Sequence, residues 1–135
     1  MPINQYWDNN EKTILLVVFE PEWTWQEYSD GLDETREIVK DIEHTYHEII
    51  DMRQTGKVPQ SSPIQHMMKG RQQGSRYLGI VVLVGAPKMM EIFVNVFKKA
   101  YGTRFPERLI VETIEDAYTL IAAYKDTVPS DEEGG

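Results

Sequence analysis

Five short apolar segments, separated by stretches with helical features, constrain this chain more than any other feature. They are Ile3–Trp7, Thr13–Phe19, Tyr46–Met52, Gly79–Gly85 and Arg108–Glu112. The runs Ile14–Phe19 and Ile80–Val84 contain no polar residue, which is typical of strands that are covered on both faces. Strands that alternate with helices indicate a mostly parallel sheet with right-handed crossovers.

Helix signals stand between these strands. Thr24 and Glu27 have the spacing of a capping box, and Trp23 with Tyr28 predicts a hydrophobic staple beside it. Ser62-Pro63 and Pro87 are favourable helix starts, and Thr113 suits the cap of a last helix. The predicted helices are about 24–42, 62–74, 87–101 and 114–126. The inner face of the last helix is expected to carry Ile114, Ala117, Tyr118, Ile121 and Tyr124.

The turn-rich segment Asp8-Asn9-Asn10-Glu11 joins the first two apolar runs and predicts a β-hairpin. The expected fold class is therefore α/β, with a single mostly parallel sheet, an antiparallel N-terminal strand and the element order ββαβαβαβα. We expect one domain over residues 1–126. The polar, acidic residues 127–135 predict a disordered tail.

Composition narrows the functional classes. The chain has 135 residues, of which 41% are hydrophobic and 27% charged, and it has no cysteine. Disulfides, thiol nucleophiles and thiolate metal sites are thereby excluded. No apolar run approaches the ~20 residues that a membrane-spanning helix needs, and the N-terminus lacks the pattern of a signal peptide. We expect a cytoplasmic protein.

The net charge of −8 is unevenly divided along the chain. Residues 1–51 carry 3 basic and 13 acidic side chains, residues 52–108 carry 10 basic and 2 acidic, and residues 109–135 carry 1 basic and 7 acidic. The basic middle block either forms an anion-binding face or is solvated beside the protein's own acidic helices. Because the chain is acidic overall and shows no basic stripe with interleaved aromatic residues, nucleic acid is not an expected partner.

The element order resembles that of the STAS domains, the SpoIIAA-like fold of anti-sigma-factor antagonists, over about residues 3–124. Three places carry the resemblance: the strand that ends at Asp51 before the serine-capped helix, the apolar strand 80–84 before a helix, and the segment 111–117 with its acidic helix start. The resemblance implies a non-enzymatic regulatory or protein-interaction module. In antagonist members, one serine at the start of the second helix is phosphorylated by a partner kinase.

The serine motif departs from the family's pattern. Antagonist members have an Asp-Ser-Ser-Gly-like sequence, whereas this chain has Gln60-Ser61-Ser62-Pro63. Ser61 and Ser62 are candidates for phosphorylation, because a helix N-terminus favours phosphate and Arg53 and Lys57 precede it. The alternative is that Ser62 acts only as an N-cap.

A second candidate site lies at the carboxyl ends of the strands, where parallel sheets collect ligands. That edge is expected to present Glu20, Glu22, Trp23, Asp51, Arg53, Gly85, Lys88 and Thr113. With Lys57, the cations Arg53 and Lys88 are candidates to bind a small anionic ligand or a partner. The alternative is that Asp51 and Arg53 form an ion pair that orders the loop, while Trp23 is only the helix staple.

Two methionine pairs either form an adaptable contact surface, for self-association or a protein partner, or fill the core. Met67 and Met68 form one pair and Met89 and Met90 another, and methionine adapts readily to different contacts. The segment 87–101 is apolar on more than one face, which is typical of a helix that is buried or covered by a partner. A homodimer is one form that such a contact takes.

Metal binding and catalysis are not expected. His44 and His47 with Glu48 have the spacing of a helix face, but they lie at the start of a predicted strand, where residues three apart point to opposite faces. No nucleophile elbow, P-loop or dinucleotide-binding glycine pattern is present. The sequence therefore predicts no cofactor and no enzyme, with an interaction module as the first hypothesis and an anion binder as the second.

Overall fold

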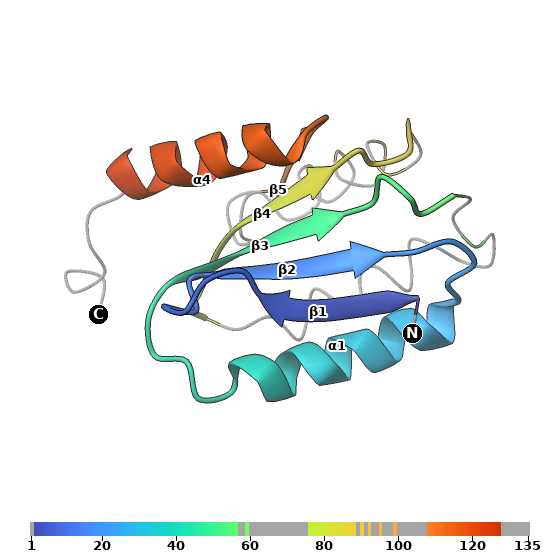
Figure 1. Ribbon diagram of the computed structural model, residues 1–135, viewed down its shortest axis with the longest axis horizontal. Coiled ribbons are helices and arrows are strands. Elements are labelled where there is room, and N and C mark those ends of the chain that lie inside the picture. The colour runs from blue at the N-terminus through green and yellow to red at the C-terminus, as the bar shows by residue number, and fades with distance from the viewer. Residues whose placement is uncertain are drawn as a thin grey trace.

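The computed structural model contains a single five-stranded sheet flanked by helices (Figure 1). It describes residues 2–56, 59, 76–88, 90, 92, 95, 99 and 108–127, with residues 108 and 125–127 through their backbone alone. The strands are β1 (Ile3–Trp7), β2 (Ile14–Phe19), β3 (Tyr46–Asp51), β4 (Leu78–Val84) and β5 (Arg108–Val111). The described long helices are α1 (Trp25–Val39) and α4 (Ile114–Thr127). The predicted helix 62–74 lies outside the described residues.

The strands lie in sequential order, β1-β2-β3-β4-β5. β1 is antiparallel to β2, and the other pairs are parallel. The predicted α/β class and the antiparallel first strand are confirmed. Because each parallel strand adds on the same side of the previous one, right-handed crossovers place their helices on one face of the sheet.

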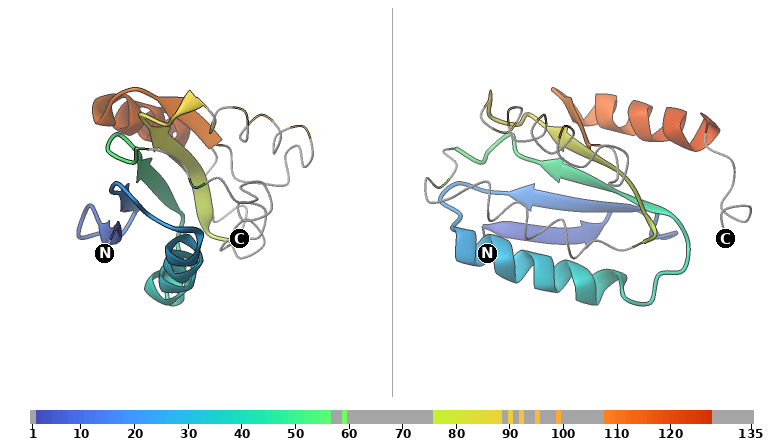
Figure 2. Two further views of the ribbon diagram at one scale, coloured as in Figure 1. Left: turned by 90° about the vertical axis from the view of Figure 1, so that its right-hand side faces the viewer. Right: turned by 180° about the vertical axis from the view of Figure 1, so that it is seen from behind.

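Two apolar layers sandwich the sheet, and Figure 2 shows α1 and α4 on its two sides. Val39 of α1 and Met90, from the segment between β4 and β5, belong to the first layer. Ala117 and Ile121 of α4 belong to the second layer, on the opposite face. Val81 and Leu83 of β4 point into the first layer, and Ile80, Val82 and Val84 point into the second. The prediction that this apolar strand is covered on both faces is confirmed.

The start of α1 follows the sequence signal. Glu27 N donates to Thr24 Oγ1 at 3.1 Å, and Thr24 N donates to Glu27 Oε1 at 2.9 Å. This capping box contributes about 1 kcal/mol to helix stability. The rings of Trp23 and Tyr28 lie 6.3 Å apart, as the predicted staple requires. The helix ends at Val39, before the predicted residue 42, because Ile42 N bonds to Val39 O in a tighter turn.

A bulge interrupts the pairing of β3 with β4. Tyr46 pairs with Leu78 and Glu48 pairs with Val81, so that His47 faces two residues of β4. Ile80 N donates to Nδ1 of the buried His47 at 3.1 Å, and the imidazole takes the place of a ladder carbonyl. A Cβ on Gly79 would lie 2.3 Å from this ring. Glycine is therefore required at this position for the bulge to form.

Two expectations about helix faces need revision or remain open. Tyr118 was expected on the inner face of the last helix, but it is 36% exposed. The reason is that α4 packs on β3, β4 and β5 and this side chain projects past them. Its hydroxyl donates to Asp8 Oδ2 at 2.7 Å. In the segment 87–101, Lys88, Ile92, Asn95 and Lys99 are helical and exposed.

No described helix is long and apolar enough to cross a membrane.

Candidate functional site

The carboxyl ends of β2 to β5 meet at one edge of the sheet. The helical segment that follows β4 packs through Met90 in the first layer, whereas α4, which follows β5, packs in the second. The chain therefore leaves β4 and β5 toward opposite faces. In α/β sheets, ligands bind at such a point, where neighbouring connections diverge.

Asp51 and Arg53 form the charged centre of this edge. Arg53 donates from Nε to Asp51 Oδ1 at 2.9 Å, from Nη2 to Oδ2 at 2.8 Å, and from its backbone N to Oδ1 at 3.1 Å. The carboxylate side chain is 12% exposed and the arginine side chain is 51% exposed. The predicted loop-ordering ion pair is confirmed, and it leaves one side of the guanidinium in solvent.

The electrostatics fix both groups in their ionised forms. The hydrogen bond from Arg53 lowers the pKa of Asp51, and partial burial opposes this shift without cancelling it. The pKa of Arg53 is raised, first by its hydrogen bond to Asp51 and also by the charge of Glu115 at the start of α4. The positive charge of Arg53 is thus paired with Asp51 and also lies within the electrostatic influence of Glu115.

Gly85 provides the space in which Arg53 lies. Its φ is +65°, and a Cβ at this position would lie 2.6 Å from Cγ of Arg53. Its backbone N donates to Val111 O at 2.9 Å, which joins the ends of β4 and β5. A glycine is required here both for the backbone conformation and for the close approach of the arginine.

The loop after β3 is fastened to the start of α1. Trp23 Nε1 donates to the hydroxyl of the buried Thr55, and Trp25 Nε1 donates to Pro59 O at 3.2 Å. Both indoles are themselves buried, with their rings edge to face at 5.0 Å. Trp23 is therefore more than the predicted staple, because it also positions the loop that carries Arg53.

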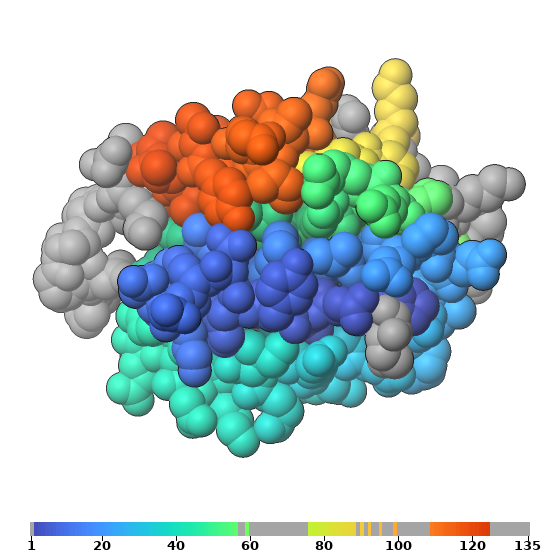
Figure 3. All heavy atoms as spheres, in the orientation of Figure 1, coloured from blue at the N-terminus to red at the C-terminus, as the bar shows by residue number. Residues whose placement is uncertain are grey.

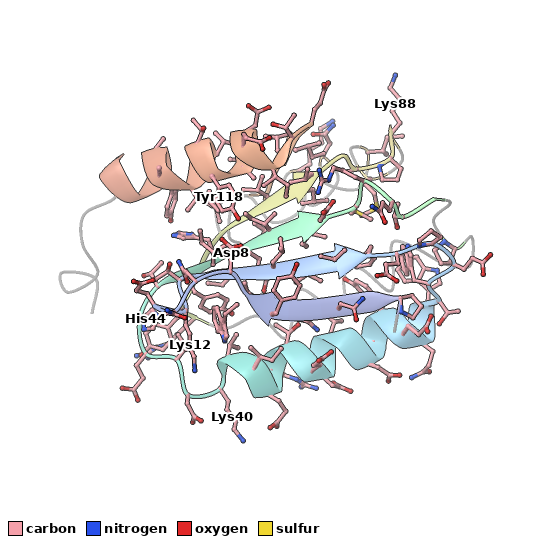
Figure 4. The ribbon with its side chains drawn as sticks, in the orientation of Figure 1. Asp8, Lys12, Lys40, His44, Lys88 and Tyr118 are labelled. Carbon is pink, nitrogen blue, oxygen red and sulfur yellow. The ribbon has the colours of Figure 1, made fainter. Side chains whose placement is uncertain are left out.

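The other residues predicted at this edge do not join the pair. Glu20 and Glu22 are exposed, and Glu20 accepts from Asn4 Nδ2 at 3.3 Å. Thr113 caps α4 by accepting from Asp116 N at 3.0 Å. Lys88 is exposed and points away from the body of the molecule (Figure 4).

Five candidates lie outside the described residues, and their predictions stay untested. They are Lys57, Ser61, Ser62, Met67 and Met68.

The histidines near β3 have separate surroundings. Nε2 of the exposed His44 lies 3.0 Å from Lys12 O, whereas His47 is buried beside Ile80 and packs edge to face on Tyr124. Among the residues that the structure describes, no group of three or more His, Asp or Glu side chains is placed to hold a metal ion.

Sequence reasoning missed the roles of Thr55 and Glu115 at this edge. Thr55 lies 32 residues from its partner Trp23, and Glu115 reaches the neighbourhood of Arg53 only through the packing of α4. Neither contact has a local sequence signal, because each depends on how the sheet brings distant loops together.

Chemically, this edge offers hydrogen-bond donors and no described nucleophile beside a base. Asp51 occupies Nε and Nη2 of Arg53, and no described residue accepts from Nη1. A guanidinium held in this way can bind a second carboxylate or a phosphate through its outer side.

Comparison of the chain with protein-family models and with curated proteins gives no match. Fold and site together define the protein as an α/β domain with one mixed, sequentially ordered sheet and a fixed arginine at its carboxyl edge.

Proposed function

We propose that this chain is a non-enzymatic interaction module of the STAS-like class that docks a partner protein at the carboxyl edge of its sheet. The antiparallel first strand and the mostly parallel sheet fit the order that the resemblance implies, which supports the class. Function is a property of the site and not of the fold, and the residue that defines the docking surface is Arg53.

The observation that carries the proposal is the half-exposed guanidinium of Arg53. Asp51 fixes its orientation with two side-chain hydrogen bonds, and Gly85 leaves room for it over the end of β4. An arginine that is already ordered loses little side-chain entropy when it binds an acidic group. Arginine is also among the residues that dominate protein interfaces.

A matched pair of substitutions tests this proposal. Arg36 on α1 is the control, because it too pairs with a carboxylate, Asp33, and its side chain is also 51% exposed. Tagged wild-type, Arg53→Gln and Arg36→Gln proteins are compared by affinity capture and quantitative mass spectrometry. We expect a partner that wild type and Arg36→Gln retain and Arg53→Gln loses, with an affinity loss of tenfold or more in titration with the purified partner. Equal capture by all three proteins would reject Arg53 as the docking residue.

Phosphorylation at Ser61 or Ser62 is the regulatory part of this proposal. A phosphate there adds about −1.5 to −2 charge next in sequence to the basic loop of Arg53 and Lys57. We expect Ser62→Glu to change affinity for the captured partner while the far-ultraviolet circular dichroism spectrum stays unchanged. Ser62→Ala separates loss of the cap from gain of charge, and unchanged binding across the Ser61 and Ser62 variants would sink the switch.

A small anionic ligand is the second candidate for the same edge. The divergence of the connections after β4 and β5 favours it, since ligands collect at such points. Ligand binding stabilises the native state by about 2.7 kcal/mol at a hundredfold excess over Kd. We expect phosphate or a nucleotide to raise the Tm of wild type and Arg36→Gln but not of Arg53→Gln. A flat Tm across a panel of nucleotides, phosphate and anionic lipids would count against it.

A further inference from the structure

One half of a sheet face has no helix over it in the described part of the chain. α4 packs against β3, β4 and β5, and on the same face β1 and β2 present four residues that we call the β1–β2 shelf: Asn4, Tyr6, Leu16 and Val18. Tyr6 pairs with Leu16, and Asn4 pairs with Val18, which places each pair on one face of the sheet. Leu16 packs against the second apolar layer, so this is the α4 face.

The shelf is accessible. Tyr6 is 52% exposed, and the other three residues are half-buried. Figure 3 shows β1 and β2 as a continuous blue band beside α4, without another coloured element above them. Isolated exposed aromatic residues are common, but here the exposed ring continues a row that runs from Leu16 to the buried Ile49 and Val82. The shelf is thus the open end of a core layer.

Carboxylates border the shelf. Asp8 accepts from the Tyr118 hydroxyl, which reaches from α4 toward the end of β1 (Figure 4). Glu115 lies close enough to add to the electrostatic field at Tyr118. Glu20 bonds to Asn4 at the other end of the shelf. The turn beside Asp8 adds Glu11 and Lys12, whose charges offset each other, so the border of the shelf is acidic.

The dimensions of the shelf suit one helix. Two strands and the gap beside them span about 10 Å, which is close to the diameter of a helix. Strands of five or six residues extend over about 17–20 Å, the length of a helix of about three turns. α4 already packs in this way on the neighbouring strands, and two helices on one face lie 8–10 Å apart.

We propose that the β1–β2 shelf docks an amphipathic helix of a partner protein, with apolar residues on Tyr6, Leu16 and Val18 and lysine or arginine at its margins. Charge complementarity selects this occupant. α1 and α4 of a second copy do not provide it, because the outer surface of α1 carries Glu27, Asp30 and Glu34 beside few cations, and α4 begins with Glu115 and Asp116. The exposed helical residues Lys88, Ile92 and Lys99 of a second copy are the competing occupant, which the dimer measurement below tests. This inference goes beyond the docking edge at Arg53 and does not depend on it.

The probe is a fluorescent amphipathic peptide of about 14 residues with leucine on one face and lysine on its margins. The matched control is the same peptide with glutamate in place of lysine. Binding to the full chain is measured by fluorescence anisotropy at about 0.15 M salt, where long-range attraction is screened. We expect the lysine peptide to bind at least tenfold more tightly than the glutamate peptide.

Two substitutions locate the site. Tyr6→Ser removes the exposed ring of the shelf. Ile92→Ser is the control, because it removes an apolar residue that is 60% exposed on the helical segment after β4. We expect Tyr6→Ser to weaken binding of the lysine peptide about fivefold or more and Ile92→Ser to leave the affinity for this peptide unchanged. Circular dichroism spectra of both variants check that they fold.

Three results would overturn the inference. Equal affinity for the two peptides would show that the acidic border does not select the charge of the helix. An equal loss of peptide affinity in Tyr6→Ser and Ile92→Ser would show that the peptide does not bind at the shelf. A dimer that native mass spectrometry detects in wild type and not in Tyr6→Ser would assign the shelf to a second copy. Arg53→Gln should leave peptide affinity unchanged, so a failure here stays separate from a failure of the docking edge.

Discussion

At the scale of single residues, the candidate site depends on a glycine as much as on its charges. Arg53 lies over the end of β4 because Gly85 has no Cβ, and its guanidinium turns toward Asp51 because the two residues are only two positions apart. The bidentate geometry follows from the planar fork of arginine. A lysine at position 53 would keep the charge and lose the orientation.

Gly85 and Gly56 make a matched comparison. Both have a positive φ, +65° and +66°, but a Cβ on Gly56 would meet nothing within 4 Å. We expect Gly56→Ala to cost about 1 kcal/mol of unfolding free energy, for backbone strain alone. Gly85→Ala should cost about 2–3 kcal/mol, because the new methyl group also collides with Arg53.

Urea unfolding of these alanine variants measures the difference. In an Arg53→Ala background, the cost of Gly85→Ala should fall toward that of Gly56→Ala, because the Cγ atom in closest contact is gone. Equal costs at the two glycines in the wild-type background would contradict the role assigned to Gly85.

The Asp51 carboxylate gives the fold a defined response to acid. Its pKa is lower in the fold than the ordinary value of an aspartate, so its ion pair stabilises the native state above about pH 5 and is lost as pH falls through the folded pKa. We expect Asp51→Asn to cost about 1 kcal/mol at pH 7, since Arg53 is half exposed. The difference from wild type should shrink as pH falls below about 4.

Urea titrations of wild type and Asp51→Asn at pH 7, 4 and 2 follow this loss. Asp33→Asn is the control, because Asp33 belongs to an exposed pair on α1, and we expect a smaller cost there at pH 7. A difference between wild type and Asp51→Asn that stays constant from pH 7 to pH 2 would contradict the assignment.

At the scale of elements, local signals were accurate and contacts between elements were not predictable. The capping box at Thr24 and the continuous apolar run of β4 were sufficient to place α1 and the central strand. The bulge at His47 was not visible in sequence, because it depends on register: the imidazole accepts from Ile80, 33 residues away. The contact of Tyr118 was not visible in sequence for the same reason, since its partner Asp8 is 110 residues away.

The Tyr118–Asp8 hydrogen bond ties α4 to the β1–β2 hairpin. Partial burial, with the hydrogen bond and charge of Asp8, raises the pKa of Tyr118 to about 12. Because the neutral hydroxyl is favoured, the bond is present at pH 7 and is lost only as pH rises above the ordinary tyrosine range. We expect Tyr118→Phe to lower the unfolding free energy at pH 7 by about 0.5–1.5 kcal/mol.

The control for this prediction is Tyr6→Phe, because Tyr6 is more exposed and its hydroxyl has no hydrogen bond within the described part of the chain. We expect a change of less than about 0.5 kcal/mol there. Urea unfolding at pH 7 compares the two variants, and equal effects would show that the bond to Asp8 adds nothing to the anchoring of α4.

At the scale of the whole molecule, the alternation of apolar runs and helical segments predicted the α/β class and a mostly parallel sheet, because these follow from periodicity and from crossover handedness. It also placed Asp51 and Arg53 at the carboxyl edge of the sheet, since Asp51 is the last residue of β3 and Arg53 follows it by two positions. The open shelf beside α4 was not predictable. It exists because three crossovers advance in one direction and, among the described helices, only α4 packs on the other face.

This arrangement raises the question of whether the two apolar layers unfold together. All three tryptophans, Trp7, Trp23 and Trp25, pack in or against the first layer, so their fluorescence does not sense α4 directly. Ile121 of α4 is fully buried in the second layer. We expect Ile121→Ala to cost about 3 kcal/mol and to shift the tryptophan fluorescence transition as far as the circular dichroism transition, because the sheet residues of β3 and β4 belong to both layers.

Urea titrations of the wild type and of Ile121→Ala, followed by both probes, decide this point. Val39→Ala is the reciprocal variant, since Val39 is buried in the first layer, and it should also move both transitions equally. If Ile121→Ala instead shifts the circular dichroism transition and leaves fluorescence unmoved, α4 unfolds from the sheet on its own. The second layer would then be a separable cover that the buried Ile121 and the Tyr118–Asp8 hydrogen bond help to hold in place.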